Sequence, residues 1–462
     1  MPSKETVNNT THFNLYRDLL KKGTFFSVVF YSVLLIGLGC INNVSDSDTI
    51  IDKEKSVCDS DDGGLVLPDG FCATIVIDSL GPSRHIAVAP NGDIYVKIRS
   101  EKGGIAALRD TTGDFEADII EIFSKKNIEG SGYLWETGIA VQNGFIWASD
   151  TRSIYRWPIP DSDRLIPGGD PEVIVSNFPD QSSHVSKSFT IDENGFLYVN
   201  VGAPSNACQE EVRTPGSPGL APCPQLENQA GIWRFSSELP GQEYQDGMQF
   251  AAGIRHVVGL DWNSANSSLY VAQHGRDQLN TLWPDLYTIE ENAELPAEEV
   301  FRLSEGANGG WPYCYYDQRQ GKKVLAPEYG GDGEEVGRCS DYLDPVTAFP
   351  GHWAPNDLLF YTGNQFPEEY LNGAFIAFHG SWNRAPLPQQ GYNVAFIPFE
   401  NGDLSSSYEI FADGFIGEES ITSPGDAEYR PMGLAIAPDG ALFISDSRKG
   451  RIWRVVYTGE SE

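Results

Sequence analysis

Positively charged side chains are scarce in this sequence. The chain has 32 Lys and Arg residues against 65 Asp and Glu residues, so its formal net charge at pH 7 is -33. Because nucleic acids are bound by basic surfaces, this balance excludes nucleic acid as a partner. Net charge bears on solubility and says little about the fold. The few arginines that stand in glycine-rich loops are therefore the cations to follow.

Familiar catalytic motifs are also absent. The sequence contains no HExxH and no paired CxxC, so a zinc site has poor support. It shows no GxSxG, no Walker loop and no Rossmann fingerprint. Without CxxCH, no c-type haem is attached to this chain. No local motif therefore carries the chemistry by itself.

Methionine is rare, whereas turn-forming residues are abundant. Only 3 Met occur beside 48 Gly, 29 Pro and 12% aromatic residues, which favours a turn-rich all-β protein over a helical one. A length of 462 residues allows one large β domain or two or three smaller domains.

The N-terminus has the pattern of an export signal. Lys21 and Lys22 precede an apolar run at 24–36, and Cys40 follows directly after Gly39. We predict a signal peptide at 1–40 with a lipobox-like end, so that a lipid on Cys40 anchors the chain to a membrane in the periplasm or cell envelope. A cleaved signal with an ordinary cysteine and a membrane-anchor helix remain open.

The remaining cysteines support export. Besides Cys40, six cysteines could form three bridges in an exported chain. Neighbours in sequence suggest the pairs 58–72, 208–223 and 314–339, although 15 pairings are possible. Residues 41–64 are acidic and without periodicity, and we interpret them as a flexible tether.

One phrase recurs from residue 65 onward: an apolar alternation, a turn with Asn, Asp or Gly, and a second apolar run. Its six copies stand at 86–96, 139–149, 189–199, 259–271, 352–363 (a looser copy) and 434–445. Repeated hairpins at this spacing predict an all-β, six-bladed β-propeller over 65–462. We expect an early strand at 71–77 to close the ring against 450–457. A β-sandwich is the alternative.

The stretch 250–279 predicts a hairpin with strands at 257–262 and 269–272. The loops that flank the two strands lie at the same end of such a hairpin. Arg255 and the backbone of Gly275 and Arg276 should therefore face one space.

Several loop residues are candidates for chemistry near the propeller axis. His184 stands immediately before the third phrase, and a neutral imidazole can take a proton from a hydroxyl near pH 7. Arg255, Arg384 and Arg430 enter loops at corresponding places. Because arginine binds carboxylates with two parallel hydrogen bonds, these cations favour a planar anionic ligand. A solvated loop or a bridge between blades is the structural alternative for each of them.

Over residues 65–457 the sequence resembles the quinoprotein sugar dehydrogenases, which include soluble glucose, sorbosone and pyranose dehydrogenases. The phrases that carry the resemblance are GIRHVVGLDW, QHGRD, GANGGWPYCYYD, HWAPNDLLFYTGNQFP, FIAFHGSWNRAPLPQQGYNV and YRPMGLAIAPDG. The resemblance implies a six-bladed propeller that binds pyrroloquinoline quinone (PQQ) and one Ca²⁺.

The resemblance also implies roles for single residues. His184 matches the general base, and Arg255 matches the arginine near the quinone carbonyl that receives the hydride. Gly275 and Arg276 match two backbone carbonyls that hold Ca²⁺, whose preferred ligands are oxygens. Arg430 matches a clamp on a cofactor carboxylate.

Three positions depart from the family pattern. Ser183 stands where glucose dehydrogenases have an acidic neighbour of the base, and His256 stands where they have Asn. Ser381 falls at the position of a cofactor-binding Lys, with Asn383 and Arg384 as substitutes close by.

The resemblance therefore predicts an exported PQQ- and Ca²⁺-dependent dehydrogenase that oxidises an aldose or a sugar-derived aldehyde. A separate electron acceptor, such as a cytochrome c or a quinone, would take the electrons, since the chain carries no haem. The alternative is a carbohydrate- or protein-binding propeller that has lost PQQ. A metal-dependent lactonase would need carboxylate and Asn ligands at the axis, where the loops offer Arg and His.

Overall fold

The computed structural model describes residues 57–99, 104–123 and 137–459. The chain divides between Glu54 and Lys55, and all described residues belong to the second unit. The predicted signal peptide at 1–40, the anchor Cys40 and residues 41–56 of the predicted tether lie outside the described residues. No helix within the described ranges has the length and apolar character needed to cross a membrane.

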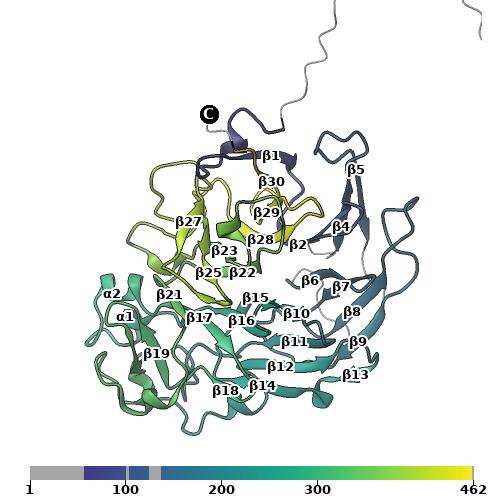
Figure 1. The fold of residues 1–462 in the computed structure, drawn as a ribbon. Coiled ribbons are helices and arrows are strands. Elements are labelled where there is room, and N and C mark those ends of the chain that lie inside the picture. Colours follow the sequence, from purple (N-terminus) through teal and green to yellow (C-terminus); the bar gives the residue numbers. More distant parts are fainter. Residues whose placement is uncertain (1–56, 100–103, 124–136, 460–462) are drawn as a thin grey trace, which may run out of the picture. The chain divides into compact units, whose positions relative to one another are not determined.

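Six sheets form the blades of a β-propeller, which confirms the predicted fold class. One strand of each sheet lies at the centre of the ring (Figure 1). These inner strands are β2 (Ser83–Val88), β6 (Ile139–Gln142), β10 (Phe189–Ile191), β15 (Val257–Asn263), β22 (Pro355–Phe360) and β28 (Pro431–Ile436). A cavity of about 390 Å³ along the axis is lined by residues of all six.

The other strands follow outward in each blade. Blade one continues with β3 (Ile94–Ile98), β4 (Ile105–Arg109) and β5 (Ile119–Phe123). Blade two continues with β7 (Phe145–Ser149), β8 (Ile154–Pro158), β9 (Glu172–Ser176) and β13 (Gln242–Glu243). Blade three continues with β11 (Phe196–Val201), β12 (Gly231–Ser236), β14 (Met248–Ala252) and β18 (Ala307–Asn308). Blade four continues with β16 (Ser268–Gln273), β17 (Glu298–Leu303) and β21 (Thr347–Phe349). Blade five continues with β23 (Ala374–Phe378), β24 (Asn393–Ile397) and β27 (Glu409–Ala412). Blade six continues with β29 (Leu442–Asp446), β30 (Ile452–Tyr457) and β1 (Phe71–Ile77).

The connections contain short elements. They are the two-stranded ribbons β19 (Cys314–Asp317) with β20 (Lys322–Leu325) and β25 (Phe399–Glu400) with β26 (Asp403–Leu404), the helices α1 (Leu279–Leu282) and α2 (Ile289–Glu294), and the 3-10 helices η1 (Asp62–Gly64), η2 (Pro224–Glu227), η3 (Tyr244–Asp246), η4 (Pro327–Tyr329), η5 (Gly337–Asp341), η6 (Glu368–Tyr370) and η7 (Trp382–Arg384).

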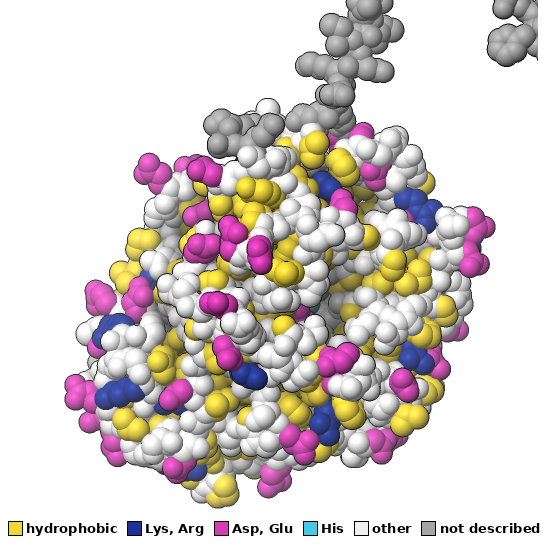
Figure 2. Space-filling model, viewed as in Figure 1, with side chains coloured by type: hydrophobic (Ala, Val, Ile, Leu, Met, Phe, Trp, Pro, Cys, Tyr) yellow, Lys and Arg dark blue, Asp and Glu magenta, His cyan; other side chains and the backbone are white. Residues whose placement is uncertain are grey.

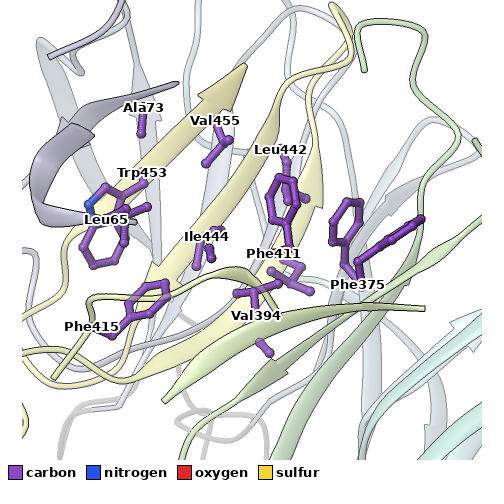
Figure 3. Packing of buried hydrophobic residues seen from close by; sticks show 14 of the residues in the cluster. Leu65, Ala73, Phe375, Val394, Phe411, Phe415, Leu442, Ile444, Trp453 and Val455 are labelled. Atoms are coloured by element: carbon purple, nitrogen blue, oxygen red, sulfur yellow. The ribbon is translucent and has the colours of Figure 1, made fainter. Parts of the chain in front are cut away.

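The ring closes as the sequence predicts. Strand β1 pairs antiparallel with β30, with Phe71 opposite Tyr457, so the start of the described chain forms the outer strand of the last blade. Buried side chains of blades five and six then pack against each other beside this closure (Figure 3). The ring of Phe415 meets Trp453 of β30 edge-on, with 5.3 Å between the ring centroids.

The hairpins explain the repeated phrase. In the first copy, Gly92 has φ +89° in the turn between β2 and β3, a conformation that glycine adopts without strain. The looser copy at 352–363 is different, and the prediction of a turn there was wrong. Pro355, Asn356 and Asp357 lie inside β22, and its connection to β23 is the longer segment 361–373. Proline is tolerated there because an inner strand is an edge strand.

Two buried aspartates connect neighbouring blades at the axis. Asp261 accepts a hydrogen bond from the Phe360 amide at 2.9 Å, and Asp357 accepts one from the Leu434 amide at 2.8 Å. Burial raises the pKa of Asp261 to about 7 and that of Asp357 to about 8.

Three disulfides join Cys58 to Cys72, Cys208 to Cys223 and Cys314 to Cys339. These are the pairs that neighbours in sequence suggested. The first holds the residues just before β1, where the Asp59 amide also donates to the Ala73 carbonyl at 2.9 Å. The second and third stabilise long connections of blades three and four, which form one wall of the site described next.

Candidate functional site

The starts of the inner strands and the loops after the second strands lie at the same end of the ring, because neighbouring strands in each blade are antiparallel. We call this end the site end. Arg84 in β2, His184 before β10, Arg255 before β15 and Arg430 before β28 all belong to it.

The side chain of His184 is half-buried and held in one tautomer. Its Nδ1 lies 2.6 Å from the carbonyl oxygen of Ala203. A carbonyl can only accept, so Nδ1 carries the proton and Nε2 keeps its lone pair. Burial, followed by the positive charge of Arg255, lowers the pKa of His184 well below its ordinary value of 6.5. The imidazole is therefore neutral at physiological pH.

The loop that carries His184 is fixed by its neighbours. His184 has φ +52°, a conformation uncommon for a residue with a side chain. The Gln181 amide donates to the carbonyls of Ser183 at 2.7 Å, His184 at 3.0 Å and Gly202 at 3.0 Å. A Cβ on Gly202 would lie only 2.6 Å from the Cβ of His184. Glycine at this position thus allows the close approach of the two segments.

Three histidine rings form a row. The rings of His184 and His256 are stacked with centroids 4.7 Å apart, and the rings of His256 and His274 are 5.3 Å apart. Burial lowers the pKa of His256 and of His274, so both are neutral near pH 7. His274 also lies close enough to His379 to influence its pKa.

Arg255 is 3% exposed and bonded throughout to protein oxygens. Its Nη1 donates to the Gly275 carbonyl at 2.8 Å, which confirms that Arg255 and the Gly275 backbone face one space. Its Nε and Nη2 donate to the backbone and side-chain oxygens of Asn206, at 3.2 and 3.0 Å. Nη2 also pairs with the Asp277 carboxylate at 3.1 Å.

The Asp277 carboxylate collects donors from three loops. Besides Arg255, it accepts from Arg213 at 3.0 Å and from the Asn383 amide at 2.8 Å. Burial by itself would raise the pKa of Asp277, but Arg255, His352 and Arg213 together outweigh burial, and the pKa lies below its ordinary range. Ser381 positions Asn383, because its hydroxyl accepts from the Asn383 amide N–H at 3.3 Å.

The side chains of Arg384 and Arg276 are structural. Arg384 was a candidate substitute for a cofactor-binding Lys, but it is 2% exposed and pairs with Glu294 at 2.6 Å. It also donates to the Ala293 carbonyl at 2.8 Å, so it joins η7 to α2. The side chain of Arg276 is likewise buried and paired with Glu328.

A positively charged cavity of about 320 Å³ opens at the site end between blades five, six and one. Among its lining residues are Arg84, Arg99, His379, Arg430, Ser447 and Arg448. No described residue that lines it is acidic, whereas Asp and Glu outnumber Lys and Arg on the face shown in Figure 2. Four arginines around one cavity of an acidic protein indicate an anion-binding site.

Contacts with backbone oxygens hold Arg430 at this cavity. Its Nε donates to the His379 carbonyl at 2.9 Å, and its Nη2 donates to the Gly380 carbonyl at 2.5 Å. The His379 ring pairs through Nε2 with the Ser447 hydroxyl at 2.6 Å. Arg430 thus lies at this cavity with three other arginines as neighbours.

Sequence reasoning missed several of these residues. Arg84 and His85, near the start of β2, repeat the Arg-His pair that stands at 255–256 just before β15, and that repetition is a signal that could have been used. Asn206 and Asp277 had no such signal, because only the folded chain brings them to Arg255.

One of the two carbonyls implied as Ca²⁺ ligands, that of Gly275, already has a donor. The Gly275 carbonyl accepts from Arg255, and Asp277 accepts from Arg255, Arg213 and Asn383. The cavity behind Gly275 and Arg276 measures only about 10 Å³. Within the described residues, no group of three or more His, Cys, Asp or Glu side chains is arranged to hold a metal ion. The arrangement therefore does not fit Ca²⁺ on the carbonyl of Gly275, which the buried guanidinium of Arg255 already contacts.

A family model described as TrAA12-like matches residues 65–458, which is most of the chain. The chain belongs to the TrAA12-like family. This membership agrees with the resemblance to quinoprotein sugar dehydrogenases seen in the sequence.

Some proteins that this TrAA12-like chain resembles in sequence depend on PQQ. A PQQ-dependent pyranose dehydrogenase of Coprinopsis cinerea is 27% identical over 240 residues, which cover 45% of this chain and 31% of that protein. Matches to curated relatives span 31% to 61% of those proteins' lengths.

Two solved structures share the fold. The calcium structure of a Trichoderma reesei family AA12 enzyme has a TM-score of 0.67 at 20% identity and covers 85% of this chain and 97% of that one. The holo PQQ domain of the Coprinopsis cinerea pyranose dehydrogenase has a TM-score of 0.65 at 19% identity, with 85% and 97% covered.

Proposed function

We propose that this TrAA12-like protein is a PQQ-dependent dehydrogenase that oxidises an aldose or a sugar-derived aldehyde. One observation carries the proposal: a cavity lined by four arginines opens at the same end of the ring as a row of three neutral histidines. The family membership and the PQQ-dependent relatives support the same activity.

The residues of the cavity fit PQQ. This cofactor is a planar tricarboxylate, and Arg84, Arg99, Arg430 and Arg448 supply guanidinium groups that suit carboxylates. When bound, PQQ would supply the redox chemistry by accepting two electrons from the substrate. The protein would hold and orient the cofactor through these arginines, with Ser447 as a further hydrogen-bonding group.

His184 is the proposed general base. Its Nε2 would accept the proton of the substrate hydroxyl, while Nδ1 remains bonded to the Ala203 carbonyl. That carbonyl does the orienting work for which glucose dehydrogenases use an acidic neighbour. Burial, followed by the charge of Arg255, lowers the pKa of His184, so the imidazole is unprotonated and ready to act as a base.

Trp382 is the proposed contact with the sugar ring. It is 63% exposed, although its neighbours Asn383 and Arg384 are tied to Asp277 and Glu294. A large exposed aromatic ring on a rigid 3-10 helix offers a flat apolar surface to the C–H face of a pyranose. Its place next to the Asn383–Asp277 contact keeps it at the site end.

We further propose that the protein is exported to the periplasm or cell envelope and anchored through a lipid on Cys40. Electrons would leave to a separate acceptor such as a cytochrome c or a quinone. Calcium on Gly275 and Arg276 is not part of the proposal, because the Gly275 carbonyl accepts a hydrogen bond from the buried guanidinium of Arg255.

The test is to add PQQ to the purified protein and to record its absorbance before and after a panel of aldoses. Reduction of bound quinone by one sugar would support the dehydrogenase. Bound quinone that no aldose or sugar aldehyde reduces would contradict the substrate class. Failure to bind PQQ would favour the non-catalytic binding propeller.

A further inference from the structure

Five oxygen atoms surround the guanidinium of Arg255. They are the backbone oxygens of Asn206, His274 and Gly275, the side-chain oxygen of Asn206 and a carboxylate oxygen of Asp277. The distances run from 2.8 to 3.5 Å. Carbonyls together with one carboxylate are the kind of oxygen set that binds Ca²⁺ in proteins. Here the chain's own cation lies among them.

The cation is built firmly into this set. The side chain of Asn206 donates to the Asp277 carbonyl at 2.9 Å and accepts from the Asp277 amide at 2.9 Å, which holds the two oxygen-bearing segments together. The Arg255 amide donates to the Gln273 side chain at 2.6 Å, and the Gly275 amide donates to Glu298 at 2.8 Å. Both ends of the loop are thus fixed around the guanidinium.

A divalent ion on the Gly275 carbonyl would face two costs. It would have to share that carbonyl with the hydrogen bond from Nη1, and it would lie next to a buried positive charge that arginine does not give up by deprotonation. Repulsion between like charges is strong in a buried site because solvent screening there is weak.

We propose that Arg255 occupies the place of a divalent cation at this loop, so that PQQ binds without Ca²⁺. The part about PQQ rests on the proposed function; the part about the cation does not. Asp277 is the counter-ion, and the guanidinium keeps Gly275 and Asp277 in position when no metal is supplied. The protein would then retain its cofactor in solutions that contain a chelator.

The first experiment measures Ca²⁺ binding to the wild-type protein without PQQ, by calorimetry and by terbium luminescence. We expect no stoichiometric site in the wild type, and a new site in Arg255→Ala, where the five oxygens lose their cation. Equal binding by the two proteins would overturn the proposal. If Arg255→Ala does not fold, as judged by circular dichroism, one Ca²⁺ bound per wild-type molecule would still overturn it.

The second experiment titrates PQQ into wild-type protein in EDTA and in about 1 mM CaCl₂. This concentration is close to the dissociation constants of the weakest calcium-binding modules, so even a weak site would be substantially filled. We expect dissociation constants that agree within about twofold, a difference too small to indicate a metal requirement. Binding that is lost in EDTA and restored by Ca²⁺ would overturn the inference. Absence of PQQ binding in both buffers would defeat the proposed function, and the calcium titration would still decide the role of Arg255.

Discussion

The imidazole of His184 stacks on that of His256 with the ring planes 26° apart, while its Nδ1 donates to the Ala203 carbonyl at 2.6 Å. This arrangement fixes both the orientation of the ring and its tautomer. Nε2 is thereby left as the atom that can accept a proton.

Replacing His184 by Ala should remove the base and leave the cofactor cavity unchanged. We expect turnover to fall by about 10²- to 10⁴-fold, the usual contribution of general acid–base catalysis, with PQQ affinity unaltered. Steady-state kinetics and PQQ titration measure the two effects. Ser183→Ala, at the exposed neighbouring residue, is the matched control. Unchanged turnover in His184→Ala would remove His184 from the mechanism.

Gly202→Ala should displace the base without changing any of its chemical groups. The new Cβ would lie 2.6 Å from the His184 Cβ and 2.9 Å from the His256 Nδ1, so the loop must shift. We expect lower turnover and a loss of about 1 to 3 kcal/mol in the free energy of unfolding. Gly168→Ala, whose nearest neighbour is the flexible end of Arg164, should have neither effect. Normal turnover in Gly202→Ala would show that the close packing is not needed.

Arg84→Ala and Arg430→Ala should each weaken PQQ binding by about tenfold or more, because a charged hydrogen-bond donor to a carboxylate is lost. Fluorescence titration measures the dissociation constants, and the weakening should diminish at high salt. Arg302→Ala, on the outer side of blade four and 41% exposed in its side chain, is the control. Wild-type affinity in both variants would place the cofactor elsewhere.

Trp382→Ala should raise KM for the sugar while kcat changes little, since a flat contact with the ring binds ground state and transition state alike. Trp382→Phe should keep most of the affinity. Equal KM values in the wild type and in both variants would argue against the stacking contact.

Asp357 should make stability depend on pH. Its pKa is about 8 in the folded chain, against an ordinary value of 3.8, so the folded state keeps a proton that the unfolded state loses. The contribution of Asp357 to stability therefore falls as pH rises from about 4 to about 8. The Tm of Asp357→Asn minus that of the wild type should increase from pH 5 to pH 8. Exposed Asp163→Asn is the control, and parallel curves for Asp357→Asn and the wild type would contradict the prediction.

Much of the fold could be predicted because each hairpin is specified by residues that are close together in the sequence. Turn residues between short apolar runs mark five of the six inner hairpins, and the count of six follows from them. The predicted turn in the fifth blade was wrong because Asn356 and Asp357, residue types that favour turns, lie inside strand β22. Their polar groups are satisfied there by neighbouring blades, as in the bond from the Leu434 amide to Asp357.

The site could be predicted only in part. His184 and Arg430 stand just before inner strands, so their place at the site end follows from the repeat. Arg384 has the same sequence context as a ligand-binding cation, yet Glu294, 90 residues away, neutralises it. Pairings of this kind depend on how long loops fold back, which spacing along the chain does not reveal.

The pairing of β1 with β30 also constrains how the chain can fold during synthesis. β1 is among the first described strands to be made, and its partner is the last. The ring therefore cannot close until the C-terminal strand is available, and until then β1 has an unpaired edge. An unpaired strand edge of this kind can pair with other chains, so closure of the ring also protects the protein from misassembly.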